Sequence, residues 1–220
     1  MTPLIEFDRV SRYYSVQGRR RYVLKDISVV MPFGVSIGVL GRNGAGKSTM
    51  VRLMARADRP NRGRVHWAPG VEVSWPMGFG GGFLPALSGR DNIKVVSRIY
   101  GRDWREIFAS VQGFAELGKY IEMPLNTYSS GMRSRFNFAM SVAMDFDCYL
   151  FDEIMSVADA KFRQRAEEEM RRLAGRSTFV VVSHRMQTIR QFCQCVYVLH
   201  EGRLEFFGDV NEGIRRYETL

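Results

Sequence analysis

Residues 41–49 constrain this chain more than any other stretch, because they fit the pattern G-x-x-x-x-G-K-[ST] in the setting it requires. An apolar, β-rich run, 35–40, precedes the glycines, and a helix-like run, 48–57, follows them. Glycines let backbone N–H groups turn inward around phosphate oxygens, and the start of a helix adds partial positive charge there. An ordinary glycine turn would need neither the lysine nor the hydroxyl. The pattern therefore predicts a phosphate-binding loop whose ligand-contacting residues are Gly41, Asn43, Gly44, Ala45, Gly46, Lys47, Ser48 and Thr49.

Two side chains of this loop have separate predicted roles. Lys47 reaches toward the β- and γ-phosphates of a nucleoside triphosphate, and Ser48 offers its hydroxyl to Mg²⁺. The loop by itself predicts nucleotide binding and leaves the purpose of that binding open.

Composition limits the remaining possibilities. A chain of 220 residues, 45% of them hydrophobic, suits one domain with room for an inserted subdomain. The formal charge of +9 suits an anionic partner, but no run of basic and aromatic residues resembles an RNA-binding signature, so we predict no nucleic-acid partner. Three cysteines make no disulfide framework, and neither a signal peptide nor a membrane-length apolar run is present. We therefore expect a cytosolic protein that reaches a membrane only by docking on another protein.

Strand-like and helix-like segments alternate at both ends of the chain, whereas the middle is all helical. Strands are predicted at 4–10, 22–30, 35–40, 64–67, 71–75, 148–151, 178–182, 196–200 and 204–207. Helices are predicted at 48–57, 92–101, 104–114, 130–144 and 161–173, from 186 onward and at the C-terminus. The pattern predicts one α/β domain, 1–220, with a core at 1–82 and 145–220 and a helical subdomain at 83–144.

A buried-looking strand ends in two carboxylates, Asp152 and Glu153. Parallel sheets bind ligands at the carboxyl ends of their strands, so both side chains are expected at such an edge. Asp152 is predicted to hold Mg²⁺, and Glu153 to orient and deprotonate an attacking water. A plain acidic turn is the alternative, and the phosphate loop upstream favours the catalytic interpretation.

A second anion site is predicted where the sequence Tyr128-Ser-Ser-Gly-Met132 opens a helix. Ser129, Ser130 and Gly131 offer hydroxyls and backbone N–H groups at a helix N-terminus, where one serine also caps the helix. The segment resembles the signature motif of ATP-binding-cassette (ABC) proteins. The resemblance implies a P-loop NTPase (RecA-like) ABC nucleotide-binding domain with an N-terminal antiparallel β subdomain and an inserted helical subdomain.

Further landmarks of this family follow in order along nearly the whole chain. His184, after the strand 178–182, resembles the family's switch histidine, and Asp159 closes a segment that resembles its D-loop. Tyr14 fits the aromatic position that stacks on adenine, with Tyr13 as the competing choice. The resemblance implies a homodimer in which ATP and Mg²⁺ lie between the phosphate loop of one copy and the signature of the other.

One position departs from the family pattern. Leu84 stands where a glutamine that contacts Mg²⁺ or water is expected, and leucine cannot ligate a metal. The preceding glycine run, 80–82, is predicted to be a hinge between core and helical subdomain.

Within the family, the segments 75–83, 128–132 and 145–153 are similar to the ATP-binding subunits of Gram-negative capsular polysaccharide exporters. The resemblance implies ATP-driven export through two copies of an integral membrane permease that dock near residues 78–90, with a periplasmic co-polymerase and an outer-membrane channel beyond. It implies a peripheral location on the cytoplasmic face of the inner membrane. Three alternatives stay open: an exporter of O-antigen or teichoic acid, a soluble ABC ATPase acting on nucleic acid or ribosomes, and a nucleotide-binding regulator without turnover.

Overall fold

The computed structural model describes residues 2–77, 82–152 and 159–220. The chain divides into two compact units. The first comprises Met1–Pro76, Asp147–Glu153 and Leu173–Leu220, and the second comprises Met77–Phe146 and Ile154–Arg172. The first unit is α/β and the second is helical, so the predicted fold class is confirmed.

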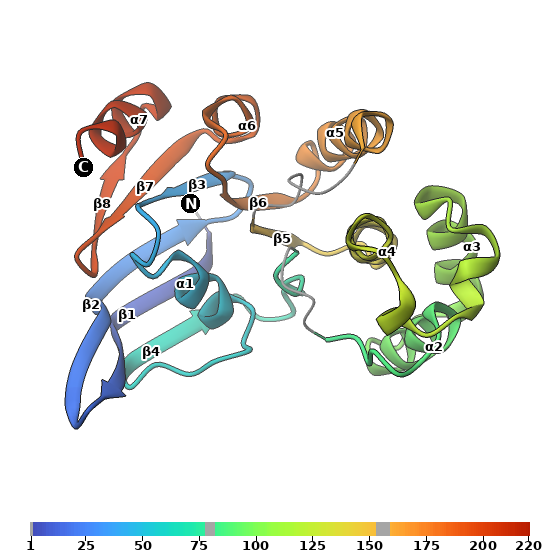
Figure 1. Ribbon diagram of the computed structural model, residues 1–220. Helices are drawn as coiled ribbons and strands as arrows, with labels where there is room; N and C mark the ends of the chain where they lie inside the picture. The colour runs from blue at the N-terminus through green and yellow to red at the C-terminus, as the bar shows by residue number, and fades with distance from the viewer. Residues whose placement is uncertain (1, 78–81, 153–158) are drawn as a thin grey trace. The chain divides into compact units, whose positions relative to one another are not determined.

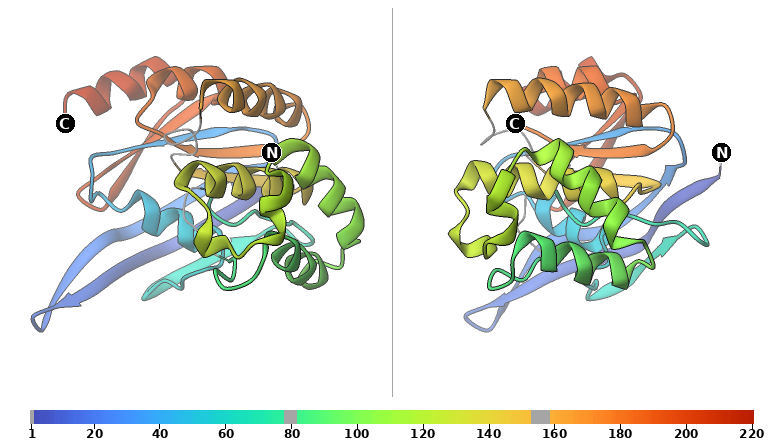
Figure 2. Two further views of the ribbon diagram at one scale, coloured as in Figure 1. Left: turned by 45° about the vertical axis from the view of Figure 1, so that its right-hand side comes forward. Right: turned by 90° about the vertical axis from the view of Figure 1, so that its right-hand side faces the viewer.

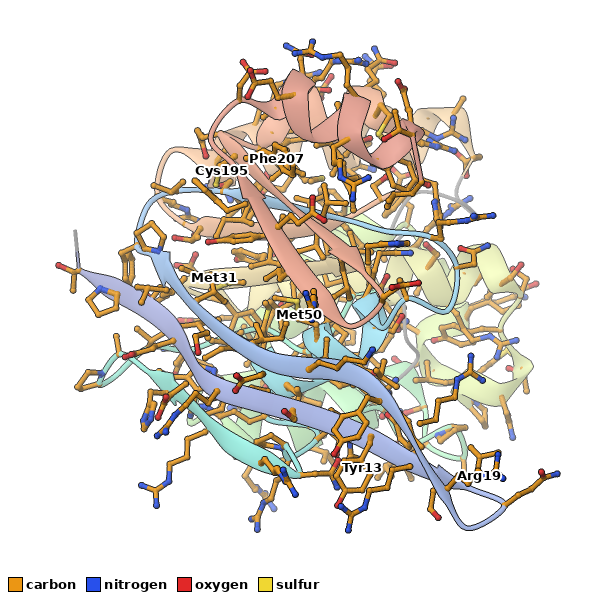
Figure 3. The ribbon with its side chains drawn as sticks, turned by 90° about the vertical axis from the view of Figure 1, so that its left-hand side faces the viewer. Tyr13, Arg19, Met31, Met50, Cys195 and Phe207 are labelled. Carbon is orange, nitrogen blue, oxygen red and sulfur yellow. The ribbon has the colours of Figure 1, made fainter. Side chains whose placement is uncertain are left out.

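An antiparallel sheet of three strands opens the first unit. It consists of β1 (Pro3–Val16), β2 (Arg19–Pro32) and β4 (Arg62–Trp67) in the order β2-β1-β4. The β1–β2 hairpin is longer than the predicted strands, because cross-strand pairing continues through Tyr13 and Tyr22 to Val16 and Arg19. In Figure 3, Arg19 marks the tip of this hairpin and Tyr13 lies a short way before it on β1.

A second, five-stranded sheet carries the phosphate loop. Its strands are β5 (Cys148–Asp152), β6 (Thr178–Val182), β3 (Ile37–Leu40), β7 (Cys195–His200) and β8 (Arg203–Phe207), in that spatial order. All neighbours are parallel except β7 and β8. Helix α1 (Lys47–Met54) lies on one side of the sheet, and α6 (Met186–Phe192) and α7 (Val210–Glu218) lie on the other (Figure 1). Because β3, β5 and β6 are buried along their whole length, they appear in the sequence as continuous apolar runs.

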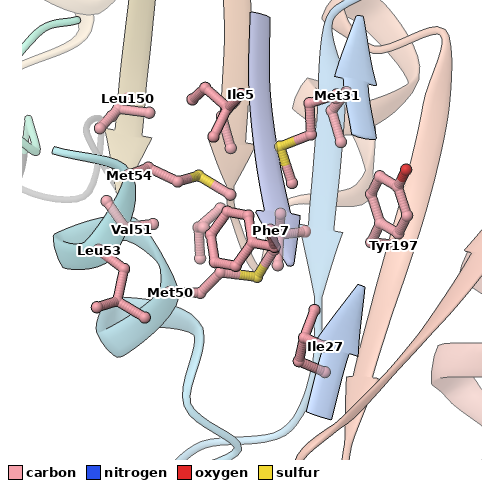
Figure 4. Packing of buried hydrophobic residues seen from close by; sticks show 14 of the residues in the cluster. Ile5, Phe7, Ile27, Met31, Met50, Val51, Leu53, Met54, Leu150 and Tyr197 are labelled. Carbon is pink, nitrogen blue, oxygen red and sulfur yellow. The ribbon is translucent and has the colours of Figure 1, made fainter. Parts of the chain in front are cut away.

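Helix α1 is held in place by a shared hydrophobic core. Met50 and Met54 extend from α1 toward Phe7 and Ile5 of β1 (Figure 4). The same cluster includes Leu150 of β5. Since α1 begins at the loop lysine, burial of its apolar face fixes where the phosphate loop ends.

The predicted strand at 71–75 is reduced to a single parallel bridge between Val73 and Cys148. The backbone N–H of Leu150 donates to Ser74 Oγ at 2.9 Å, so a side-chain hydroxyl replaces the strand bond expected beside β5. Pro76 follows directly and offers no N–H to continue a ladder.

The second unit gathers α2 (Gly89–Ile99), α3 (Trp104–Ala115) and α4 (Ser130–Ala143), as both views of Figure 2 show. Two short 3₁₀ helices, Gly118–Glu122 and Leu125–Thr127, join α3 to α4 and were not expected from the sequence. Helix α5 (Ala160–Ala174) belongs to this unit through Arg172, whereas the sequence-based division had placed it in the core. The reason is aromatic packing, since the Phe162 ring lies 5.9 Å from that of Phe138 and 5.6 Å from that of Phe114.

Candidate nucleotide-binding site

The predicted phosphate loop joins the end of β3 to the start of α1. Lys47, 8% exposed, turns back over this loop, and its Nζ donates to the carbonyl oxygens of Gly41 at 2.6 Å and Arg42 at 3.2 Å. The loop is also closed by a backbone bond of 3.1 Å from Ala45 N to Arg42 O. The loop backbone itself therefore fixes the position of the Lys47 ammonium group.

Two glycines of the loop are required by close packing. A Cβ on Gly46 would lie 2.4 Å from Val23 Cγ1 and 3.0 Å from Val23 O, and its φ of +112° is unfavourable for any other residue. A Cβ on Gly41 would lie 2.5 Å from the carbonyl oxygen of Leu199. Gly44, with φ of +79°, has nothing within 4 Å of such a Cβ. The loop backbone therefore packs closely against β2 at Gly46 and against β7 at Gly41. At Gly44, in the middle of the loop, an added Cβ would meet open space.

Asp152 is the last residue of β5 and lies level with Val182 of β6, which in turn pairs with Val39 of β3. The carboxylate and the phosphate loop therefore leave the same edge of the sheet. Alternation along β5 places Asp152 on the side of Cys148 and Leu150, which belong to the core cluster shared with α1. This is also the face of the sheet from which the phosphate loop enters α1.

The donor set at this edge suits Mg²⁺. Asp152 is only 6% exposed, and Ser48 is a half-buried residue in the first turn of α1. A carboxylate and a hydroxyl are the oxygen ligands that Mg²⁺ accepts alongside water and phosphate. The predicted catalytic base, Glu153, lies outside the residues that the structure describes.

His184 follows β6 at the same carboxyl edge of the sheet. Its side chain is exposed, and the turn that carries it is closed by a 3.0 Å bond from Arg185 N to Ser183 Oγ. The topology thus brings His184, Asp152 and the phosphate loop to one edge of the sheet.

The two candidate tyrosines lie on opposite faces of β1. Tyr14 faces α1, with its hydroxyl 3.4 Å from Thr49 Oγ1 and 3.0 Å from a guanidinium nitrogen of Arg52. The hydrogen bond with Thr49, helped by bonds from nearby arginines, lowers the pKa of Tyr14. Tyr13 instead packs against Tyr22, with ring centroids 5.1 Å apart. Of the two rings, that of Tyr14 adjoins the phosphate-loop helix.

In the helical unit, the predicted signature residues open α4. Ser129 is its N-cap, and its Oγ accepts a 3.2 Å bond from Met132 N. Ser130 is exposed and Gly131 is half-buried. Tyr128 is buried and donates its hydroxyl proton to Tyr120 O at 2.8 Å, and this burial raises the pKa of Tyr128 to about 12. Tyr128 is therefore an anchor for the signature segment.

Asp159 has two partners within the helical unit. Its carboxylate accepts a bond from Phe162 N at 2.9 Å and forms a 2.5 Å ion pair with Arg135 of α4. Arg135 was not predicted as a site residue, because nothing in a single sequence pairs a residue of one helix with a residue 24 positions later that precedes another helix. Residues 156–158 of the predicted D-loop lie outside the described residues.

Leu84 is fixed through its backbone, although the residue is 51% exposed. The buried Asn92 accepts a 2.7 Å bond from Leu84 N and donates a 3.0 Å bond to Leu84 O. Of the predicted glycine hinge, only Gly82 is described, with a positive φ of +100°. An amide side chain therefore orders this segment, although it is not the glutamine that the family pattern places at position 84.

Comparisons with known proteins agree with this geometry. A family model described as ABC transporter matches residues 24–156. The polysialic acid transport ATP-binding protein KpsT of Escherichia coli is 38% identical over 98% of this chain and 96% of its own length. The capsule polysaccharide export ATP-binding protein CtrD of Neisseria meningitidis serogroup B is 38% identical over 99% of this chain and 100% of its own.

Among solved structures, the ATP-binding cassette MJ0796, determined as a dimer in a post-hydrolysis state with ADP and Pi, matches with a TM-score of 0.80. That match covers 92% of this chain and 97% of that one at 21% identity, which establishes a common fold. None of the helices within 2–77, 82–152 and 159–220 is long and apolar enough to cross a membrane. The chain therefore belongs to the ABC transporter family, in the group of ATP-binding proteins that includes these capsule-export relatives.

Proposed function

We propose that this chain is the ATP-binding and ATP-hydrolysing subunit of an ABC transporter that powers export of capsular polysaccharide across the inner membrane. The observation that carries this proposal is the convergence of the phosphate loop, Asp152 and His184 at one sheet edge in a chain 38% identical to capsule-export ATP-binding proteins.

The proposed chemistry uses the residues of this edge. Lys47 and the loop N–H groups bind the triphosphate and stabilise charge that develops on it. Ser48 and Asp152 would hold Mg²⁺, which supplies charge neutralisation between the β- and γ-phosphates. Glu153 takes a proton from the attacking water, and His184 keeps the reacting groups in position.

The proposed active form is a homodimer. Ser129, Ser130 and Gly131 would face the phosphate loop of the second copy, where an exposed helix N-terminus favours phosphate. Because each nucleotide then contacts two chains, ATP binding stabilises the dimer by mass action. The ion pair between Asp159 and Arg135 would hold the D-loop end against the signature helix during closure.

Two copies of an integral membrane permease are the proposed membrane partners. The helical unit exposes several large apolar side chains, of which Leu84 belongs to the segment where docking is expected. Others in that unit are Val95, Ile99, Tyr120 and Met123. Through the permease the chain would sit at the cytoplasmic face of the inner membrane, and a periplasmic co-polymerase and an outer-membrane channel would complete the route.

Reconstitution with the permease from the same genome tests the function. Proteoliposomes would be loaded with a lipid-linked capsular polysaccharide, and phosphate release would be followed with and without it. Stimulation by the polysaccharide, lost in Lys47→Ala, supports the proposal. Stimulation by O-antigen or teichoic acid precursors in its place would move the assignment to those polymers.

The soluble alternatives are separated by two further measurements. Retarded migration of DNA or RNA in a gel, without co-purification of any membrane protein, would favour a nucleic-acid ATPase. Complete absence of phosphate release, both alone and with the permease, would favour a regulator without turnover.

A further inference from the structure

The Tyr14 ring is surrounded by a set of polar contacts that the nucleotide-binding motifs do not include. Tyr14 is 37% exposed, and its hydroxyl contacts the phosphate-loop helix. Two arginines contact it from different directions, Arg12 on one ring face and Arg52 at the hydroxyl.

Arg12 covers one face of the ring. It precedes Tyr14 by two residues on β1, so both side chains project from the same side of the strand. The guanidinium carbon lies 5.0 Å from the ring centroid, within the range of a cation–π contact. The guanidinium is itself fixed, since it forms a 3.0 Å ion pair with Asp58 and a 3.5 Å bond to Asn61.

Arg52 holds the opposite end of the tyrosine. This residue lies in the last turn of α1, and one of its guanidinium nitrogens donates to Tyr14 Oη at 3.0 Å and to Thr49 Oγ1 at 3.2 Å. The ring position is therefore tied to the helix that carries the phosphate-loop lysine. A base stacked on Tyr14 and a triphosphate bound by the loop would then be held at a set separation.

We propose that Arg12 and Arg52 are positioning residues for nucleotide binding, which hold the Tyr14 ring at the phosphate-loop helix so that adenine stacks on the face opposite Arg12. This inference rests on the proposed adenine-stacking role of Tyr14. Because the ring is ordered before the base arrives, less side-chain freedom is lost when the base binds. Both arginines contact Tyr14, so the proposal assigns their effect to the base and not to the phosphate tail.

The test compares a ligand that carries adenosine with one that is the triphosphate alone. Dissociation constants for ATP and for inorganic tripolyphosphate are measured by calorimetry on the full chain, with EDTA present to prevent hydrolysis. Arg52→Met and Arg12→Met keep the aliphatic stems, and each is expected to weaken ATP about three- to tenfold while tripolyphosphate changes less than about twofold. Arg59→Met, an exposed arginine on the loop after α1, is the matched charge control and should change neither constant.

Tyr14 variants separate the positioning role of the arginines from the stacking role of Tyr14 on which it rests. Tyr14→Ala is expected to weaken ATP about 5- to 150-fold, because base stacking is lost. Tyr14→Phe keeps the ring and removes the hydroxyl, so Arg52→Met in that background should cause little further loss. That non-additivity is expected of a positioning residue that acts through the hydroxyl.

The possible outcomes are distinct. If Tyr14→Ala leaves the ratio of the dissociation constants for ATP and tripolyphosphate unchanged, the stacking role of Tyr14 and the positioning role of the arginines both fail. If Tyr14→Ala changes the ratio but neither arginine variant does, the positioning role alone is overturned. Equal weakening of ATP and tripolyphosphate by the arginine variants would place their effect in the phosphate loop and would also overturn it.

Discussion

Two glycines of the phosphate loop, Gly44 in its middle and Gly46 at its end, should respond very differently to the same added methyl group. Gly44 and Gly46 both have positive φ, at +79° and +112°, but only Gly46 is in tight contact with its surroundings. We predict that Gly46→Ala destabilises the folded protein much more than Gly44→Ala does, in the absence of nucleotide.

The expected magnitudes follow from the geometry. At Gly44 the new Cβ meets nothing within 4 Å, so the cost is the left-handed conformation alone, about 1–2 kcal/mol. At Gly46 the conformational cost is about 1–3 kcal/mol, because +112° lies beyond the left-handed region that other residues tolerate. The Cβ would also lie 2.4 Å from Val23 Cγ1, and relieving such overpacking costs about 1–3 kcal/mol more.

Urea unfolding of the two variants measures the difference, as a shift in midpoint at constant slope. Val23→Ala provides a further check, because it removes Cγ1 and leaves Val23 O at 3.0 Å. The double variant should therefore cost less than the sum of the single ones. Equal destabilisation by Gly44→Ala and Gly46→Ala would refute the reasoning, since contact with β2 would then contribute nothing.

Three further predictions concern Lys47, Glu153 and the three cysteines. Lys47→Ala should weaken ATP binding at least about tenfold, because a buried cation at the phosphate loop is lost. An unchanged dissociation constant for ATP, measured by calorimetry, would contradict the role of Lys47 in binding the triphosphate. Glu153→Gln should keep ATP binding but slow phosphate release about 10²- to 10⁴-fold, and undiminished turnover would remove its assignment as base. Burial raises the pKa of Cys148 to about 12 and also raises those of Cys193 and Cys195, so little thiolate forms at pH 8. Iodoacetamide should then label the folded protein slowly and the urea-unfolded chain at all three sites, as mass spectrometry would record.

Local patterns in the sequence were enough to predict the central parts of this protein. The phosphate loop is contiguous, and its glycines, lysine and hydroxyl specify a backbone conformation within nine residues. The carboxylate of Asp152 ends a run that is apolar because the strand is buried on both faces. In each case the physical cause acts between neighbours along the chain, so the sequence displays it directly.

Other features were decided by contacts between residues far apart in the chain. The segment 71–75 forms one bridge in place of a strand, because Ser74 Oγ takes a bond from Leu150, 76 residues later. Tyr14 and not Tyr13 adjoins the phosphate loop, because its hydroxyl meets Thr49 and Arg52 across 35 and 38 residues. Sequence patterns carry no information on such pairings, since each partner alone resembles any other serine, tyrosine or arginine. Only the folded chain, by burying α1 between its two sheets, brings these partners together.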